Sequence, residues 1–87
     1  MAWIVKYDSR ATKELAGLDK AVARRIVDYL KDVANSGDPT SRGKRLTGPM
    51  VMYWCYRIGD YRAICEHHHE ELMILTIQVG HRSKAYD

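Results

Sequence analysis

Arginine and tyrosine recur together in two short segments of the second half of the chain. Residues 56–62 read Tyr-Arg-Ile-Gly-Asp-Tyr-Arg, and residues 80–86 read Gly-His-Arg-Ser-Lys-Ala-Tyr. Arginine supplies a permanently charged planar fork that matches phosphate, and tyrosine can stack on an unpaired base. Neither segment carries a cluster of carboxylates. This combination suits the handling of phosphate esters of RNA.

Cleavage of RNA without a metal makes three chemical demands. A base must take the proton of the 2′-hydroxyl, fixed cations must stabilise the phosphorane, and an acid must protonate the 5′-oxygen. Arg57, Arg62 and Arg82 are candidate cations, whereas His81, a tyrosine or a lysine could carry the proton. The alternative is that Arg57 and Arg62 are solvated charges on a sheet, and that Arg82 and Tyr86 belong to a frayed polar terminus.

The composition is that of one small domain spanning residues 1–87. Of the 87 residues, 46% are hydrophobic, which is enough for a core. Lysine and arginine outnumber aspartate and glutamate by 14 to 11, and Lys44 and Arg45 add to a basic second half that favours polyanions. Cys55 and Cys65 are expected to be reduced. The N-terminus lacks signal-peptide features and no stretch approaches membrane-spanning length, so we expect a cytoplasmic protein without a membrane partner.

Hydrophobic periodicity and capping residues predict a strand, two helices and then three strands. Strands are expected at 2–7, 51–57, 61–66 and 72–79, and helices at 11–16 and 20–35, with a polar, basic loop over 36–50. Asp8 or Ser9 can cap the first helix and Asp19 the second. This order predicts an α+β domain of two layers, in which a helix hairpin covers one face of a sheet that ends in an antiparallel three-stranded meander. The other face is open or covered by a partner.

Strand alternation assigns the candidate residues to faces of the sheet. Cys55 and Arg57 share one face, and Trp54 and Tyr56 share the other. Arg62 is expected on the open face, because an unpaired arginine is costly to bury. Four aromatic residues are expected to pack in the core rather than to contact a cofactor: Trp3, Trp54, Tyr7 and Tyr29.

Three consecutive histidines, His67, His68 and His69, are expected in a surface turn. The alternative is a metal site, but consecutive side chains do not converge on one point and no second cluster completes the set. We therefore expect neither a metal nor another cofactor. His81 differs because it adjoins Arg82; the alternative there is a polar residue at the end of a strand.

The order and spacing of these pieces resemble the RelE/ParE superfamily of toxins from bacterial type II toxin–antitoxin modules. The resemblance covers nearly the whole chain. It includes the segments at 3–7, 13–20, 22–26, 43–49, 56–62 and 79–82, with Tyr86 behind them. The likeness is greatest to the RelE branch. It implies a RelE-like two-layer fold and an mRNA interferase that cuts mRNA in the ribosomal A site by attack of the 2′-hydroxyl.

The resemblance also implies roles for individual residues. Arg62 would stabilise the phosphate in the transition state, Arg82 would bind or protonate at the scissile group, and Tyr86 would stack on or orient a base. Lys44 and Arg45 would bind the RNA backbone. Two further cations, Arg57 and Lys84, are candidates for RNA binding. The implied partners are a RelB-like antitoxin, the ribosome with its mRNA, and operator DNA through the antitoxin alone.

One position departs from the family pattern. Where this chain has Cys55, RelE-branch toxins usually have a basic residue that looks like part of the catalytic set. A thiol carries no permanent charge, and loss of one cation at a transition state costs about 10²-fold or more in rate. Cys55 then marks an attenuated toxin or a disabling substitution, and a nucleophilic thiol is a third option. Two other functions remain open: a ParE-type inhibitor of DNA gyrase that acts by protein contacts, and an RNA-binding module without activity.

Overall fold

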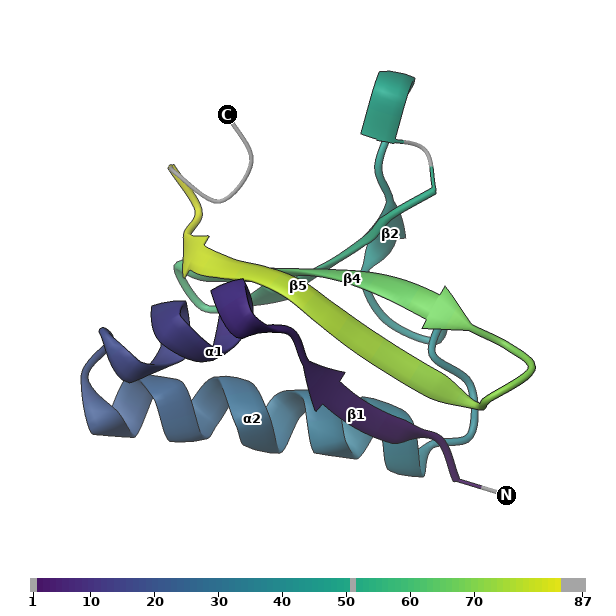
Figure 1. The fold of residues 1–87 in the computed structure, drawn as a ribbon, viewed down its shortest axis with the longest axis horizontal. Helices are drawn as coiled ribbons and strands as arrows, with labels where there is room; N and C mark the ends of the chain where they lie inside the picture. Colours follow the sequence, from purple (N-terminus) through teal and green to yellow (C-terminus); the bar gives the residue numbers. More distant parts are fainter. Residues whose placement is uncertain (1, 51, 84–87) are drawn as a thin grey trace.

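Two helices lie against one face of a five-stranded sheet in the computed structural model, which describes residues 2–50 and 52–83 (Figure 1). The elements in chain order are β1 (Ile4–Tyr7), α1 (Ser9–Ala16), α2 (Lys20–Asn35), β2 (Lys44–Arg45), a 3-10 turn η1 (Gly48–Met50), β3 (Trp54–Ile58), β4 (Tyr61–His68) and β5 (Met73–His81). The strand order is β1-β5-β4-β3-β2. Only β1 pairs in parallel, with β5, and the other neighbours are antiparallel. This is the expected α+β fold. None of the described helices is long and apolar enough to cross a membrane.

Both helices begin where an aspartate can cap them. The Asp8 carboxylate accepts from the backbone N–H of Ala11 at 2.8 Å, and the Asp19 carboxylate accepts from that of Ala21 at 3.0 Å. Each bond satisfies an N–H group that has no partner within the helix. The apolar residues of α2 then recur at helical spacing, so that Ile26, Leu30 and Val33 are fully buried against the sheet.

The sheet has a thick core on its helix-covered face and a thin one on the other. Tyr56, Ala63 and Ile74 join the helices in the main core. A second, smaller cluster of Leu46, Cys55 and Ile64 contains no helical residue. The predicted alternation is confirmed, because Cys55 and Tyr56 fall in different clusters. The face of the sheet that was predicted to be open is thus partly apolar, since Tyr53 and Ile77 also pack against this cluster.

The loop predicted over 36–50 contains the short edge strand β2. Lys44 pairs with Cys55 and Arg45 with Trp54 in an antiparallel register. The strand was not predicted because two charged residues between loop segments carry no periodicity. The other strands are offset from their predicted limits by a few residues, and β4 extends to His68 because its ladder with β5 continues past Glu66.

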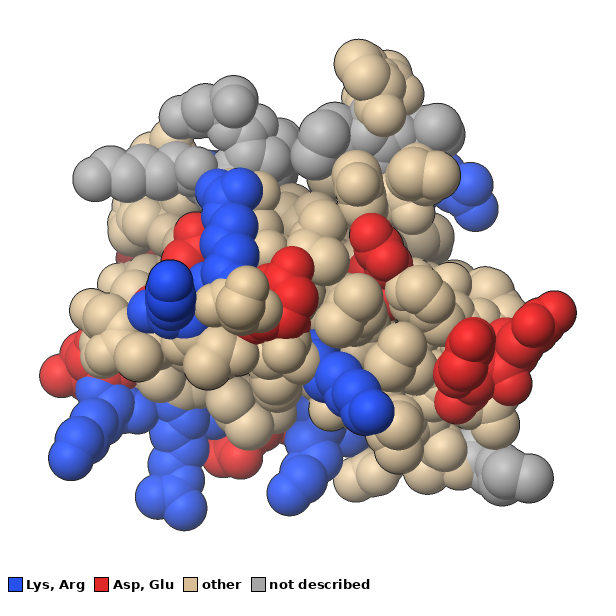
Figure 2. Space-filling model, viewed as in Figure 1, with Lys and Arg blue, Asp and Glu red and all other residues tan. Residues whose placement is uncertain are grey.

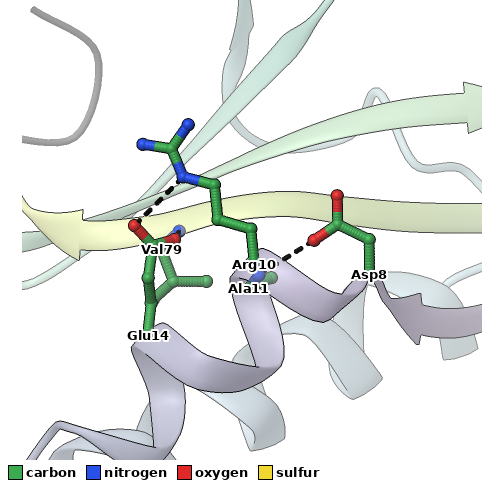
Figure 3. A network of polar contacts seen from close by, with 5 residues as sticks. All are labelled: Asp8, Arg10, Ala11, Glu14 and Val79. Carbon is green, nitrogen blue, oxygen red and sulfur yellow. Dashed lines mark hydrogen bonds and ion pairs between the residues drawn. The ribbon is translucent and has the colours of Figure 1, made fainter.

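Glu14 of α1 completes the hydrogen bonding of the sheet (Figure 3). The β1 strand ends at Tyr7, opposite Thr76, so β5 has no strand on that side beyond this point. There the Glu14 carboxylate accepts the backbone N–H of Val79 at 2.8 Å, while Arg10 Nε lies 3.4 Å from its other oxygen. A helix side chain thus stands in for a missing neighbour strand.

Replacing Glu14 by alanine is expected to lower the free energy of unfolding by about 1–3 kcal/mol, because the Val79 N–H then loses its acceptor. Glu14→Gln keeps a carbonyl acceptor at the same reach and is expected to lose less. Chemical denaturation of the two variants measures the difference. Equal losses would show that the charge of Glu14, rather than this hydrogen bond, matters.

Candidate functional site

A cavity of about 260 Å³ opens on the face of the sheet away from the helices. It is lined by Gly43, Lys44, Cys55, Arg57 and Arg62. We call it the cationic cavity, because three of these five residues carry positive charge and none carries negative charge. Its residues come from the loop before β2 and from three neighbouring strands, so the tertiary fold gathers them from distant parts of the chain.

The pairing register determines which cations meet. Arg57 of β3 stands directly opposite Arg62 of β4, and Lys44 stands opposite Cys55 one row away. Side chains directly opposite each other in such ladders have Cβ atoms about 5 Å apart. On its other side Arg62 pairs with Gly80, which carries no side chain. Two guanidinium groups therefore share one small region of the cavity, an arrangement that suits a bound phosphate.

Gly43 allows the basic loop to lie close against β3. Its φ of +74° falls in the left-handed region, and a Cβ there would stand 2.4 Å from the Cys55 carbonyl oxygen and 2.8 Å from Trp54 Nε1. Only glycine fits both the angle and the space. No role was predicted for this glycine, although its place at the start of the basic segment 43–49 was the available signal. Without it, Lys44 would not reach its place beside Cys55.

Cys55 presents a neutral group at the centre of these charges. Its side chain is buried, and burial raises the pKa of the thiol, although the positive charges of Arg62, Lys44 and Arg57 act in the opposite direction. A thiol whose pKa is raised stays protonated at neutral pH and is a poor nucleophile. The site therefore holds a neutral thiol where a cation was expected from the resemblance.

His81 and Arg82 lie at the end of β5, beside the turn between β3 and β4. The Arg82 backbone N–H donates to the Asp60 carbonyl at 2.7 Å, which holds the Arg82 backbone against that turn. His81 instead stands opposite Tyr61, with ring centroids 5.4 Å apart, on the side where Tyr61 packs against the main core. The structure therefore does not gather His81 with the arginines. Lys84 and Tyr86 lie outside the described residues.

Arg45 also points away from the cationic cavity. It pairs with Trp54, one residue out of phase with Lys44 and Cys55, so it belongs to the opposite face.

Cations of the first half of the chain also contribute to the charged surface. Figure 2 shows lysine and arginine side chains gathered over α2, along the lower edge of the view. A groove of about 570 Å³ there is lined by Arg24 and Arg25 together with the carboxylates of Asp28 and Asp32, and it reaches Arg57, which borders the cationic cavity too. Basic side chains are therefore not confined to the second half, although along α2 they alternate with acidic ones.

The three consecutive histidines have three different environments, so the expected surface turn is wrong for His67 and His68. Both lie in β4, because the strand pairs with β5 as far as His68. His67 Nε2 lies 2.9 Å from the Tyr56 hydroxyl, His68 contacts Glu66 at 2.8 Å, and His69 packs edge-on against Trp3. No local pattern predicts the contact between His67 and Tyr56, because the two residues are eleven positions apart.

Tyr56 links His67 to the basic loop. Its single hydroxyl hydrogen is donated to the Pro39 carbonyl, so the phenol oxygen accepts from His67 Nε2, which must carry a hydrogen. Burial lowers the pKa of His67 to about 4, with His69 and Arg45 acting in the same direction and Asp38 in the opposite one. His67 is therefore neutral at physiological pH.

The His67 environment is expected to make stability depend on pH. The folded pKa lies below the ordinary value of about 6.5, so the unfolded chain binds the proton more readily. Stability should be complete above pH 6.5 and fall as the pH drops from 6.5 towards 4. Denaturation of wild type and His67→Gln across this range isolates the effect from that of the carboxylates. Parallel pH profiles would contradict it.

Comparisons with known proteins place this geometry in a family. The family model described as the ParE toxin of the type II toxin–antitoxin system parDE matches residues 5–86. No curated protein sequence matches the chain. Among solved structures, the chain is similar to the RelBE2 toxin–antitoxin complex from Mycobacterium tuberculosis, with 21% identity and a TM-score of 0.86 over 97% of this chain and 95% of that one.

Two further structures share the fold. The isolated RelE toxin of E. coli is 23% identical, with a TM-score of 0.77 over 98% of this chain and 89% of that one. An archaeal RelE–RelB complex from Pyrococcus horikoshii is 25% identical, with a TM-score of 0.72 over 98% and 100%. Since the family model spans nearly the whole chain and the fold agrees, this protein belongs to the RelE/ParE superfamily of type II toxins.

Proposed function

We propose that this toxin is a metal-independent, ribosome-dependent endoribonuclease that cuts mRNA in the A site and so inhibits translation. The observation that carries the proposal is the cationic cavity, in which Lys44, Arg57 and Arg62 converge from three strands. A toxin that acts by protein contacts alone has no need of paired guanidinium groups around a cavity, whereas a phosphorane needs fixed cations.

The roles follow from the positions of the cations. Arg62 stabilises the charge that develops on the phosphate oxygens, and Arg57 opposite it holds the same phosphate. Lys44 contributes a third charge from the edge strand. Arg82, held at the adjacent turn, contacts the scissile group. Tyr86 stacks on a base, a role that rests on the family resemblance.

The cavity supplies charge more readily than proton transfer. Among the described residues, the five that line the cavity include no histidine and no carboxylate, and the Cys55 thiol is neutral. His81 lies on the far side of the sheet from the arginine pair. We therefore propose that the chain binds its phosphate firmly and cleaves it slowly, as an attenuated member of the RelE branch.

A RelB-like antitoxin is the proposed partner in a bacterial cytoplasm. Two of the structures similar to this chain are described as toxin–antitoxin complexes, one of RelBE2 and one of RelE with RelB. In this proposal the antitoxin covers the cationic cavity, and operator DNA is contacted through the antitoxin.

Gyrase inhibition is the second candidate, because the matching family model is that of ParE. The two functions make opposite demands on the cavity. A ribonuclease loses activity when its cations are removed, whereas a gyrase inhibitor keeps its activity as long as its contact surface is intact.

Cys55→Arg is expected to raise mRNA cleavage on translating ribosomes by about 10²-fold, because it adds a cation beside the phosphate site. Cys55→Ser, which is similar in size and neutral, is the matched control and should leave the rate near that of the wild type. Primer extension on ribosome-bound mRNA measures the cleavage. If Cys55→Arg cuts no mRNA while DNA breaks that depend on gyrase appear, the ribonuclease assignment fails.

Arg82→Ala in the Cys55→Arg background is expected to abolish cleavage and leave antitoxin affinity within a few-fold. The control is Arg10→Ala, which also removes one exposed arginine, but from α1, and Arg10 does not line the cationic cavity. Cleavage by the same primer-extension assay and antitoxin binding by calorimetry provide the two readings. Undiminished cleavage would remove Arg82 from the site.

A further inference from the structure

A further pocket, of about 210 Å³, opens at the edge of the sheet beside β2. We call it the edge pocket. Its described walls are formed by seven residues: Thr40, Arg45, Met52, Tyr53, Trp54, His67 and His69. Four of these seven side chains are aromatic or imidazole rings, one is a cation, and none is a carboxylate. The ribonuclease proposal makes no use of this pocket.

The β2–β3 ladder separates the edge pocket from the cationic cavity. Lys44 and Cys55 form one cross-strand pair and line the cavity, whereas Arg45 and Trp54 form the next pair and line the pocket. Because successive residues of a strand point to opposite faces, this two-residue strand presents one cation to each side. In the described sheet β2 is the last strand. A chain crossing this edge would therefore pass from one site to the other.

Hydrogen bonds and ring contacts fix the orientation of Trp54 and His67 in the wall of the edge pocket. Trp54 Nε1 donates to the Arg42 carbonyl at 2.8 Å, and the Trp54 and His67 rings lie 5.4 Å apart at a tilt of 36°. His67 donates through Nε2 to Tyr56, which leaves its Nδ1 as a hydrogen-bond acceptor. Rigid rings provide a stacking surface at little cost in side-chain entropy, and an acceptor can read the edge of a base.

We propose that the edge pocket holds an unstacked base of the same RNA strand whose phosphate occupies the cationic cavity. Arg45 would neutralise the phosphate of that nucleotide as the strand crosses β2, and the rings of the pocket would stack with the base. This inference rests on RNA being the substrate and adds a base-binding subsite to it. The small volume of the pocket and its combination of rings with one cation suit a single nucleotide.

The test is a coupling measurement with an RNA that cannot be cut. The probe is a 2′-O-methyl tetranucleotide, which lacks the attacking hydroxyl, and a set of versions with one base removed at each position. The full-length chain is titrated up to millimolar RNA, and the NMR signals of the Trp54 indole and of the Arg62 backbone report the two sites. Removal of one particular base is expected to weaken binding about tenfold, and the Trp54 shift should disappear with it.

His69→Ala removes an exposed ring from the pocket and should weaken binding of the intact probe by a similar factor. It should have no further effect on the probe that lacks the critical base. His68→Ala is the matched control, because this neighbouring histidine contacts Glu66 and does not line the pocket. Met52→Glu adds a carboxylate at a side chain that lines the pocket and is 73% exposed, so it weakens RNA binding without disturbing the core.

Three outcomes would overturn the proposal: no Trp54 shift with any probe, equal losses in His69→Ala and His68→Ala, or independent effects of the base and of His69. Weaker antitoxin binding by the pocket variants with unchanged RNA binding would assign the pocket to the antitoxin and overturn it as well. No cleavage occurs in these titrations. Coupling that persists while Cys55→Arg cuts no mRNA would thus retain the base subsite and reject the nuclease.

Discussion

The hydrogen bonds of the Tyr56 hydroxyl hold together the parts from which both sites are built. Tyr56 is fully buried in β3, and its phenol joins the Pro39 carbonyl of the basic loop to His67 of β4. A buried hydroxyl without partners costs about 1–3 kcal/mol, so the loop has a strong reason to close over this point. Once it is closed, Gly43 fits against β3 and β2 can pair. Lys44 and Arg45 then take their places on the two faces.

The electrostatics of the cationic cavity reveal a conflict between stability and function. Arg57 and Arg62 are directly opposite each other, and like charges in such a pair destabilise a sheet. Lys44 adds a third charge to the same cavity. A basic residue at position 55 would add a fourth, whereas the neutral Cys55 packs with Leu46 and Ile64. The present chain thus gains packing at a position where RelE-like chemistry would gain charge, which is the usual form of a stability–activity trade-off.

Local signals predicted the elements well and their pairing poorly. Asp8 and Asp19 mark the helix starts because capping involves neighbours in sequence, and the period of α2 follows from one buried face. The strand β2 was not predicted, because it forms only when Tyr56 of β3 closes the loop through its hydrogen bond to Pro39. That contact joins residues far apart in the sequence. For the same reason His67 was assigned to a surface turn, although it is a partly buried partner of Tyr56.

By itself the sequence determined the α+β class, the family resemblance and the face of the sheet to which Arg57 and Arg62 belong, because alternation within a strand is a local property. Only the tertiary structure decided which charges meet. Register placed Lys44 with the arginine pair and sent Arg45 to the ring-lined pocket, and the pairing of β5 turned His81 towards Tyr61. The pairing register of the strands depends on the closing of long loops and on the filling of a shared core. The spacing of neighbouring residues does not determine either of these.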